Sequence, residues 1–420
     1  MKSEIIKKNL SNGLRFIHIK NKAKHVIINV FVKVGSQDET PENNGISHFL
    51  EHMIWQGSKN YTAEKLRSDL KDMDANFNAS TSFKRTNHYV AGPRRHYEKM
   101  LKILLDSIQN PSFDLTEIER ERKVILDEYK RTTDDSLAIL QKSVFKTLFK
   151  DHSLSQLPIG TEENIKNITR EDLIEYYNKH YVANNMIISI SGDLEEPEKL
   201  IEKYFTLKSG EIITKEEKIT TKLESKTFIK LKESISATRI NISFLTPEYT
   251  HKDTAIIEII DYLLDYGKDI NLTTSIRQKL GLTYSIYASN LPLKEGGIFS
   301  ITTTTNPEQV ELLVESILAE FNKFETIKQK ELNRAKRKLL QTHRKINLMP
   351  FFLQEKTAQQ ELYGYKDTEE KKPQIIKEAT AKDLKRIVDE YFRNCLITIV
   401  EPREEVVKEE EVCKNLLKSN

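Results

Sequence analysis

Two histidines and a glutamate in the segment His48-Phe49-Leu50-Glu51-His52 are the residues of this chain best suited to chemistry. Residues four apart on a helix lie on one face, about one turn from each other. The imidazoles of His48 and His52 would therefore reach one tetrahedral metal ion such as Zn2+. Glu51 stands beside the second histidine, where a carboxylate can act as a general base toward water. The order H-x-x-E-H reverses the zinc-binding pattern H-E-x-x-H and predicts metal-assisted hydrolysis.

Turn residues on both sides of this segment predict a short helix. Pro41, Asn43, Asn44 and Gly45 form the leading turn, Asn44 or Ser47 is the expected N-cap, and Gly57 is the expected stop. Apolar residues recur between these limits at spacings of one, three and four, which predicts a largely buried helix. The alternative is an ordinary histidine pair without a metal, because a catalytic zinc also needs a third protein ligand.

A third ligand is available in the charged segment from Asp114 to Phe149, which predicts one long helix. Glu121 and Glu128 are seven residues apart in it, close to two full turns, so both carboxylates share a face. The helix pattern by itself favours ordinary solvated acids, because many other charged residues surround the two glutamates. The third ligand therefore stays open at this point.

Taken together, these motifs resemble the pitrilysin/insulinase family of zinc metallopeptidases, the inverzincins, in its short single-half form. In that family a glutamate ligand follows H-x-x-E-H after about 75 residues, and a second glutamate precedes this ligand by seven. Glu128 follows His52 by 76 residues, and Glu121 holds the second position. The resemblance implies that His48, His52 and Glu128 bind Zn2+, that Glu51 is the catalytic base, and that Glu121 orients the site.

Two further segments resemble the family's substrate-binding parts. Asn78-Ala79-Ser80, followed by Thr81, is similar to a sheet edge that pairs with an extended peptide in relatives; without the family it reads as a polar loop. Ser275 to Ser285 is similar to the segment R-x-x-x-G-L-x-Y-S. That similarity implies catalytic roles for Arg277 and Tyr284, which would contact the substrate backbone and stabilise the tetrahedral intermediate. Without the family, Arg277 reads as a surface residue and Tyr284 as a strand core residue.

The amino-acid composition restricts the partners and the cellular compartment that can be expected for this chain. The 420 residues suffice for two domains, and 66 Lys+Arg against 63 Asp+Glu leave a net charge of +3. This balance gives no reason to expect a nucleic-acid or membrane partner, and it disfavours the alternative of a Lys-rich nucleic-acid-binding surface. The N-terminus lacks a signal-peptide core, and no run of about 18 apolar residues occurs. Two cysteines in so long a chain favour a reducing compartment, so we expect a cytoplasmic protein.

An internal repeat predicts two similar domains. Thr169 to Leu173 reads as a capped helix start that leads to the strand Met186–Ser191, and Thr380 to Leu384 repeats this before the strand Leu396–Val400. The offset of 211 residues is half the chain, although such units also recur by chance. We expect α+β domains, each a mostly antiparallel sheet with helices packed on one face. They would span 1–206, with zinc, and 227–420, without a metal motif but with substrate-binding residues, joined by a linker at 207–226.

The resemblance implies a zinc-dependent endopeptidase that hydrolyses short or unfolded peptides inside a closed dimeric chamber. A homodimer is expected because this chain carries both the metal motif and the Arg277/Tyr284 segment, and a heterodimer with a related subunit is the other arrangement. The main alternative function is a non-catalytic peptide-binding or scaffold subunit of the same fold. The intact set of His48, Glu51, His52 and Glu128 argues against it, because such subunits tend to lose these residues.

Overall fold

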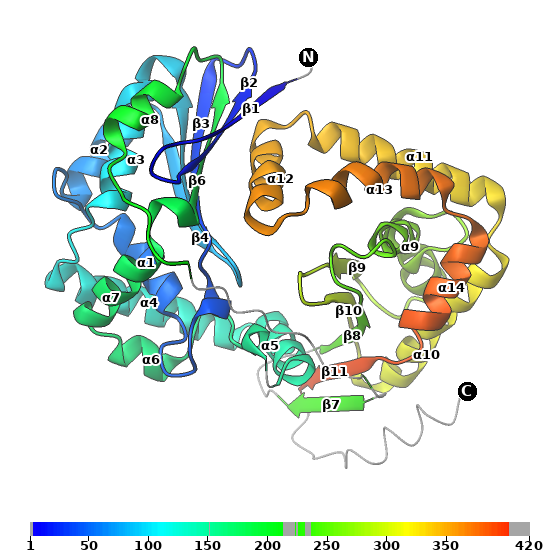
Figure 1. Cartoon of the computed structure of the whole chain (residues 1–420). Helices are drawn as coiled ribbons and strands as arrows, with labels where there is room; N and C mark the ends of the chain where they lie inside the picture. The colour runs from blue at the N-terminus through cyan, green and yellow to red at the C-terminus, as the bar shows by residue number, and fades with distance from the viewer. Residues whose placement is uncertain (1–2, 151, 213–222, 224–225, 232–236, 403–420) are drawn as a thin grey trace. The chain divides into compact units, whose positions relative to one another are not determined.

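The computed structural model describes residues 3–150, 152–212, 223, 226–231 and 237–402. The chain forms two compact units, labelled by element in Figure 1. Unit 1 comprises Met1–Arg131, Gln156–Glu216 and Lys345–Gly364, and unit 2 comprises Thr132–Ser155, Glu217–Arg344 and Tyr365–Asn420. The predicted linker lies largely outside the described residues, as do residues 403–420. No helix within the described ranges is long and apolar enough to cross a membrane.

Unit 1 is built on a six-stranded sheet of order β1-β2-β6-β3-β5-β4. Only β2 and β6 pair in parallel; the other neighbours are antiparallel. Its strands are β1 (Glu4–Asn9), β2 (Arg15–Lys20), β3 (His25–Val32), β4 (Asn76–Thr81), β5 (Thr86–Pro93) and β6 (Met186–Gly192). Its helices are α1 (Ile46–Ile54), α2 (Ala63–Asp72), α3 (Tyr97–Gln109), α4 (Leu115–Asp134), α6 (Glu162–Asn167), α7 (Arg170–His180), α8 (Glu198–Tyr204) and α12 (Pro350–Tyr363).

Unit 2 is built on a five-stranded sheet of order β7-β11-β8-β10-β9, in which only β7 and β11 pair in parallel. Its strands are β7 (Lys226–Leu231), β8 (Thr238–Thr246), β9 (Ile286–Leu291), β10 (Gly297–Thr305) and β11 (Leu396–Glu401). Its helices are α5 (Ser136–Leu148), α9 (Thr254–Tyr266), the π-helix Thr273–Lys279, α10 (Val310–Asn322), α11 (Gln329–Ile346), α13 (Lys366–Glu378) and α14 (Ala381–Tyr391).

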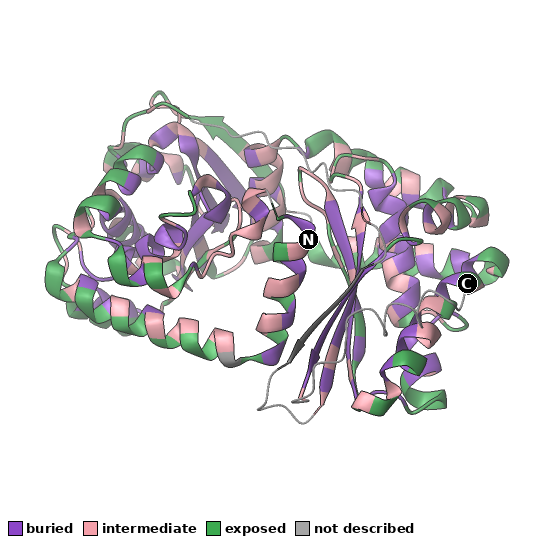
Figure 2. Cartoon of the chain, turned by 90° about the horizontal axis from the view of Figure 1, so that it is seen from below, coloured by how far each residue is buried: buried purple, intermediate pink, exposed green. Residues whose placement is uncertain are grey.

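The two sheets share one pattern, which confirms the predicted α+β fold of two similar domains. The order β2-β6-β3-β5-β4 in unit 1 corresponds to β7-β11-β8-β10-β9 in unit 2, with the parallel pair in the same place. Thr169 and Thr380 both form the predicted capping box, each with an aspartate three residues on. The helices of each unit bury one side and expose the other, as Figure 2 shows. Their buried sides contribute to a separate apolar core in each unit.

Each unit also takes in one helix from the other half of the sequence. Helix α5 packs against β8 and β11 of unit 2, as Figure 1 shows. Helix α12 packs against β2, β3 and β6 of unit 1, on the sheet face away from the main core, where Leu353, Ala358 and Leu362 meet strand residues such as Phe31. Both units are therefore discontinuous in sequence, unlike the contiguous division at 207–226 predicted above.

The predicted helix from Asp114 to Phe149 is in fact two helices, so that expectation was wrong. Helix α4 ends at Asp134, and α5 begins at Ser136. The carboxylate of Asp135 accepts a hydrogen bond from the backbone N–H of Leu137 and caps the second helix. The division between the two units falls after Arg131, in the last turn of α4, so the break follows it by a few residues and α5 belongs wholly to unit 2.

Candidate metal centre

Helix α1 carries the H-x-x-E-H segment, and a buried carboxylate outside the helix holds its first turn. The helix begins at Ile46 after Gly45, whose φ of 106° favours glycine. Neither Asn44 nor Ser47 is the N-cap, contrary to the prediction. Instead, Glu39, only 1% exposed, accepts hydrogen bonds of 2.8 Å from the backbone N–H groups of Gly45 and Ser47. A carboxylate suits this position because helix N-termini carry unpaired N–H groups and partial positive charge.

Three side chains from two helices bring metal-binding atoms together in unit 1. His48 and His52 lie on one face of α1, with ring centroids 4.8 Å apart. Helix α4 supplies Glu128, whose Oε2 is 3.8 Å from Nε2 of His48 and 3.7 Å from Nε2 of His52. One donor atom from each residue lies within 4.8 Å of the other two. The structure thus brings together the three side chains that the sequence singled out as ligands.

Glu121 orients one of these imidazoles. Its Oε2 lies 3.1 Å from Nδ1 of His52, and its side chain is buried. If Nδ1 carries the hydrogen that Glu121 accepts, Nε2 of His52 presents its lone pair toward Glu128 and His48. The two glutamates of α4, seven residues apart, therefore approach different nitrogens of His52. Glu121 lies beside Nδ1, and Glu128 lies on the side of Nε2.

The two histidines have opposite electrostatic environments. Burial, together with the nearby His52, lowers the pKa of His48 to about 4. Burial alone would lower the pKa of His52 as well, but hydrogen bonds to Glu121 and Glu128 raise it to about 9. The hydrogen bond to His52 in turn lowers the pKa of Glu128. Without a metal ion, the cluster therefore holds a neutral His48 imidazole and a His52 imidazole whose protonated form is stabilised by the two glutamates. A bound metal ion would take the place of the proton at Nε2 of His52.

Glu51 lies on the same helix and is linked to the edge strand β4. Its Oε2 accepts a 2.6 Å hydrogen bond from the hydroxyl of Thr81, the last residue of that strand. Burial raises the pKa of Glu51, although the bond from Thr81 acts in the opposite direction. A carboxylate whose pKa is raised toward neutrality can both accept and return a proton. Asn78 and Ser80 are exposed on β4, which among the described strands pairs with β5 alone and so leaves one edge of the sheet free.

The residues present fit a zinc ion. Two ligand atoms at about 2.0–2.2 Å from a tetrahedral zinc are about 3.3–3.5 Å apart, close to the observed 3.7 and 3.8 Å. Two imidazoles and a carboxylate are a common catalytic zinc set, which leaves the fourth position open. Nδ1 of His48 is buried and has no hydrogen-bond partner within the described residues. The side chain of Glu128 is 40% exposed, so small molecules can approach the ligand atoms.

Arg277 and Tyr284 belong to unit 2, and their predicted role at the metal site stays a prediction. Arg277 lies in the π-helix and is exposed, as a surface residue would be. Tyr284 precedes β9 and is 89% exposed. The alternative interpretation of Tyr284 as a strand core residue is therefore wrong, because the residue lies outside β9 and is largely exposed.

Sequence reasoning missed one residue that shapes this site, Glu39, and one contact, the bond from Thr81 to Glu51. Glu39 lies outside the helix that it caps, and no spacing rule connects it with Gly45 and Ser47. Its only signal is an acidic residue just before a turn that opens a buried helix. Thr81 was recognised as part of the strand motif, but its bond to Glu51 joins residues 30 positions apart and depends on how β4 packs on α1.

Comparisons with known proteins place this geometry in a family. Residues 15–162 match the family model described as Insulinase (Peptidase family M16), and residues 167–339 match the model described as Peptidase M16 inactive domain. An uncharacterized zinc protease of Rickettsia bellii is 30% identical over 343 residues, which cover 80% of this chain and 82% of that protein. The chain belongs to the insulinase family of peptidases, as its motifs predicted.

Two further similarities agree with this assignment. A probable mitochondrial-processing peptidase subunit beta of Arabidopsis thaliana is 28% identical over 328 residues, which cover 75% of this chain and 62% of that protein. The crystal structure of a protease from Helicobacter pylori has a TM-score of 0.89 at 23% identity and covers 95% of this chain and 100% of that chain. The metal-binding candidates all lie within the segment matched by the first family model.

Proposed function

We propose that this chain is a zinc-dependent endopeptidase that hydrolyses short or unfolded peptides. The observation that carries the proposal is the convergence of His48, His52 and Glu128 beside the buried carboxylate of Glu51. Family membership and the names of its relatives support zinc and peptide hydrolysis as the class of reaction. Peptides are the proposed partners, with no role for nucleic acid or a membrane.

The chain's own residues would divide the work of hydrolysis. When bound, zinc lowers the pKa of a coordinated water toward neutrality and polarises the scissile carbonyl. Glu51 accepts a proton from the attacking water and returns it to the leaving amine, while Thr81 keeps its carboxylate oriented. Glu121 keeps Nε2 of His52 turned toward the other ligands. Arg277 and Tyr284 are the proposed donors to the developing oxyanion.

The free edge of β4 is the proposed peptide-binding surface. An extended peptide can add to an exposed strand through backbone hydrogen bonds, which require little side-chain sequence. Asn78, Ala79 and Ser80 lie on this strand, and Thr81 at its end touches Glu51. A peptide paired with β4 would therefore run beside the general base, which would explain why one strand combines binding with access to the metal site.

The decisive experiment compares two substitutions that should have different effects on zinc content and on cleavage. Glu51→Gln should retain zinc and lose cleavage of a quenched fluorescent peptide library by at least about 100-fold, because it removes the general base. Glu128→Ala should lose both zinc and cleavage, because two histidines alone bind the metal weakly. Elemental analysis gives the metal content, and a chelator should abolish wild-type cleavage.

Two results would contradict this proposal. Substantial turnover by Glu51→Gln would remove Glu51 from the role of base, and full zinc occupancy in Glu128→Ala would overturn the ligand assignment. The alternative function, a non-catalytic peptide-binding or scaffold subunit of the same fold, would appear as zinc and peptide binding without cleavage in the wild-type protein.

A further inference from the structure

Helix α12 contacts the hairpin that joins the edge strand β4 to β5. Arg85, at the end of that hairpin, forms an ion pair through Nη2 with Oε2 of Glu355 on α12. The two side chains are only 17% and 16% exposed, and the guanidinium carbon lies 5.5 Å from the ring centroid of Phe31. A second contact lies beside it, since the hydroxyl of Tyr363 donates a 3.2 Å hydrogen bond to the backbone carbonyl of Lys84.

The ion pair between Arg85 and Glu355 is largely buried, so its loss should cost more free energy than the loss of an exposed ion pair. Burial raises the pKa of Glu355, and the charge of Arg85 opposes that change. An exposed ion pair can be lost with little effect, whereas removing one partner of a buried pair leaves an uncompensated charge. Nη1 of Arg85 is also buried, without a hydrogen-bond partner within the described residues, so Glu355 is its principal compensating group. The hairpin therefore depends on the placement of α12.

Helix α12 is itself firmly attached to the sheet of unit 1. Nε2 of Gln354 donates hydrogen bonds of 3.0 Å to the backbone carbonyls of Ile27 and Ser189, on two neighbouring strands. Leu353 and Leu362 belong to the apolar cluster on the same sheet face. A helix held at several points in this way can serve as a fixed support for a hairpin at the edge of the sheet.

The supported hairpin leads directly into the proposed peptide-binding edge. The backbone N–H of Ser82 donates a 2.8 Å hydrogen bond to the carbonyl of Arg85, which closes the turn immediately after Thr81. Because Arg85 follows Thr81 by only four residues, a fixed Arg85 also restrains the end of β4. Within the described residues β4 pairs with a strand on one side, and the turn after it also accepts hydrogen bonds from the backbone N–H groups of Ser36 and Gln37 at the carbonyls of Ser82 and Phe83. The Arg85–Glu355 pair adds the restraint on the opposite arm of this turn.

We propose that Arg85 and Glu355 are a positioning pair that holds the β4–β5 hairpin and keeps the free edge of β4 preformed for an extended peptide. The role rests on the proposed peptidase function, but the ordering of the hairpin can be measured without it. A preformed edge saves the peptide the cost of ordering the strand on binding. Loss of the pair should therefore weaken peptide binding more than it slows the chemical step.

The test measures hydrogen exchange and kinetics in the same variants of the full chain. In Glu355→Gln, the backbone amides of residues 76–86 should exchange faster by about ten-fold or more in metal-free protein, because the edge opens locally. With a quenched fluorescent peptide, KM should rise by about ten-fold while kcat changes by less than about three-fold. If the protein is no peptidase, the exchange result still decides the positioning role.

The chain offers a matched control on the same helix. Glu361 of α12 pairs with Lys7 at 2.6 Å on the opposite edge strand β1, and both side chains are about one-third exposed. Glu361→Gln removes the same charge from the same helix and should leave exchange in residues 76–86 and KM unchanged. Should Glu355→Gln fail to fold, Tyr363→Phe tests the neighbouring contact to Lys84 in the same two measurements.

Charge reversal separates positioning from general stability. Arg85→Glu and Glu355→Arg should each raise KM and hairpin exchange, and the double variant should recover most of both effects, because it restores an ion pair between the same elements. The proposal is overturned if Glu355→Gln behaves like Glu361→Gln in both measurements, or if the double variant is no closer to wild type than the single variants.

Discussion

The residues of the metal site differ in how their positions are determined. His48 and His52 share a helical face because four residues span about one turn, and this relation holds wherever the helix lies. Glu128 and Glu121 share a face of α4 for the same reason, but only packing brings that face to α1. Glu39 and Thr81 are placed by loops and strands, so each depends on contacts distant in sequence.

At this scale we predict that Glu39→Ala destabilises the metal-bearing helix. The substitution leaves the buried N–H groups of Gly45 and Ser47, together with the amide of Asn44, without their carboxylate acceptor. Each unsatisfied buried donor costs about 1–3 kcal/mol, so the free energy of unfolding should fall by about 3 kcal/mol. Urea denaturation of the metal-free protein measures this loss, and zinc affinity should fall with it, because both histidines lie in the first two turns.

The control for Glu39→Ala is Glu42→Ala in the same turn. Glu42 is exposed, so its loss should change the free energy of unfolding by no more than about 0.5 kcal/mol. Equal stability of the two variants would show that the buried carboxylate does not anchor the helix.

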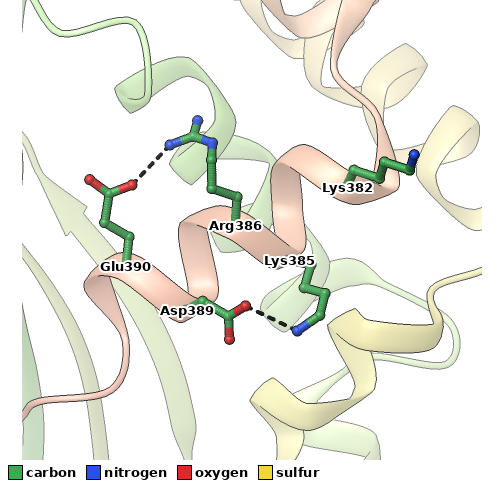
Figure 3. Close-up of a pocket in the computed structure, with 5 residues that line it drawn as sticks. All are labelled: Lys382, Lys385, Arg386, Asp389 and Glu390. Carbon is green, nitrogen blue, oxygen red and sulfur yellow. Dashed lines mark hydrogen bonds and ion pairs between the residues drawn. The ribbon is translucent and has the colours of Figure 1, made fainter.

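At the scale of elements, ion pairs join helices that the sequence pattern treats as independent. Arg386 of α14 donates hydrogen bonds of 2.9 and 2.7 Å to both carboxylate oxygens of Asp253, which precedes α9. Figure 3 shows the outer side of α14, where Arg386 also pairs with Glu390 and Lys385 pairs with Asp389 at the rim of a surface depression. Since these charges neutralise each other within the helix, we assign this depression no ligand.

The Asp253 contact predicts a pH dependence of stability. Burial alone would raise the pKa of Asp253, but Arg386 lowers it below its ordinary value, with help from His251 and Tyr391. The unfolded chain therefore binds a proton at higher pH than the folded chain. The contact stabilises the fold above the unfolded pKa of about 3.9, and this stability is lost as the pH falls through the lower folded value.

Asp253→Asn tests this dependence. At pH 7 it should lower the free energy of unfolding of the metal-free protein by about 1–2 kcal/mol, a range reduced because Arg386 is partly exposed. The difference from wild type should shrink as the pH falls below about 4 and should vanish below the lower folded pKa, where Asp253 is protonated in both states. Urea denaturation from pH 2.5 to pH 7 measures it. A difference that stays constant would contradict the assignment, and Asp389→Asn, on the exposed side of α14, is the control.

At the scale of the whole molecule, the chain contains the same fold twice, and each of the two units includes one helix from the other half of the sequence. Both units have the same order of five strands, yet the metal-binding set in the described part of the chain lies in unit 1. Unit 2 keeps the fold and presents Arg277 and Tyr284 on its surface. Under the proposed function the two similar domains would divide the labour, because a fold can be kept while its chemistry is lost.

We further predict that the active protein is a homodimer whose two chains close a chamber around the peptide. The support is that this chain carries both the metal-binding set and the Arg277/Tyr284 segment, while one relative is by name a peptidase subunit. Light scattering of the purified chain should give twice its mass of 48.9 kDa, and intact folded proteins should not be cleaved. A fully active monomer would contradict the dimer, and activity only after addition of a related subunit would indicate the heterodimer.

Features that depend on short-range geometry could be predicted from the amino-acid sequence. The motif on α1, the glutamate pair on α4 and the capping boxes at Thr169 and Thr380 follow from helix periodicity and from hydrogen bonds across three or four residues. The repeat of one capped unit after 211 residues predicted two similar domains for the same reason. These relations hold before any long-range contact forms.

Contacts between distant segments could not be predicted in this way and are known from the folded chain. The exchange of α5 and α12, the support of Arg85 by Glu355 270 residues later, and the capping of α1 by Glu39 have no periodic signature. A buried carboxylate or guanidinium takes whichever partner the packed chain brings within reach, because leaving it unpaired is costly. That choice depends on the whole set of packed elements, so it becomes visible only in the folded molecule.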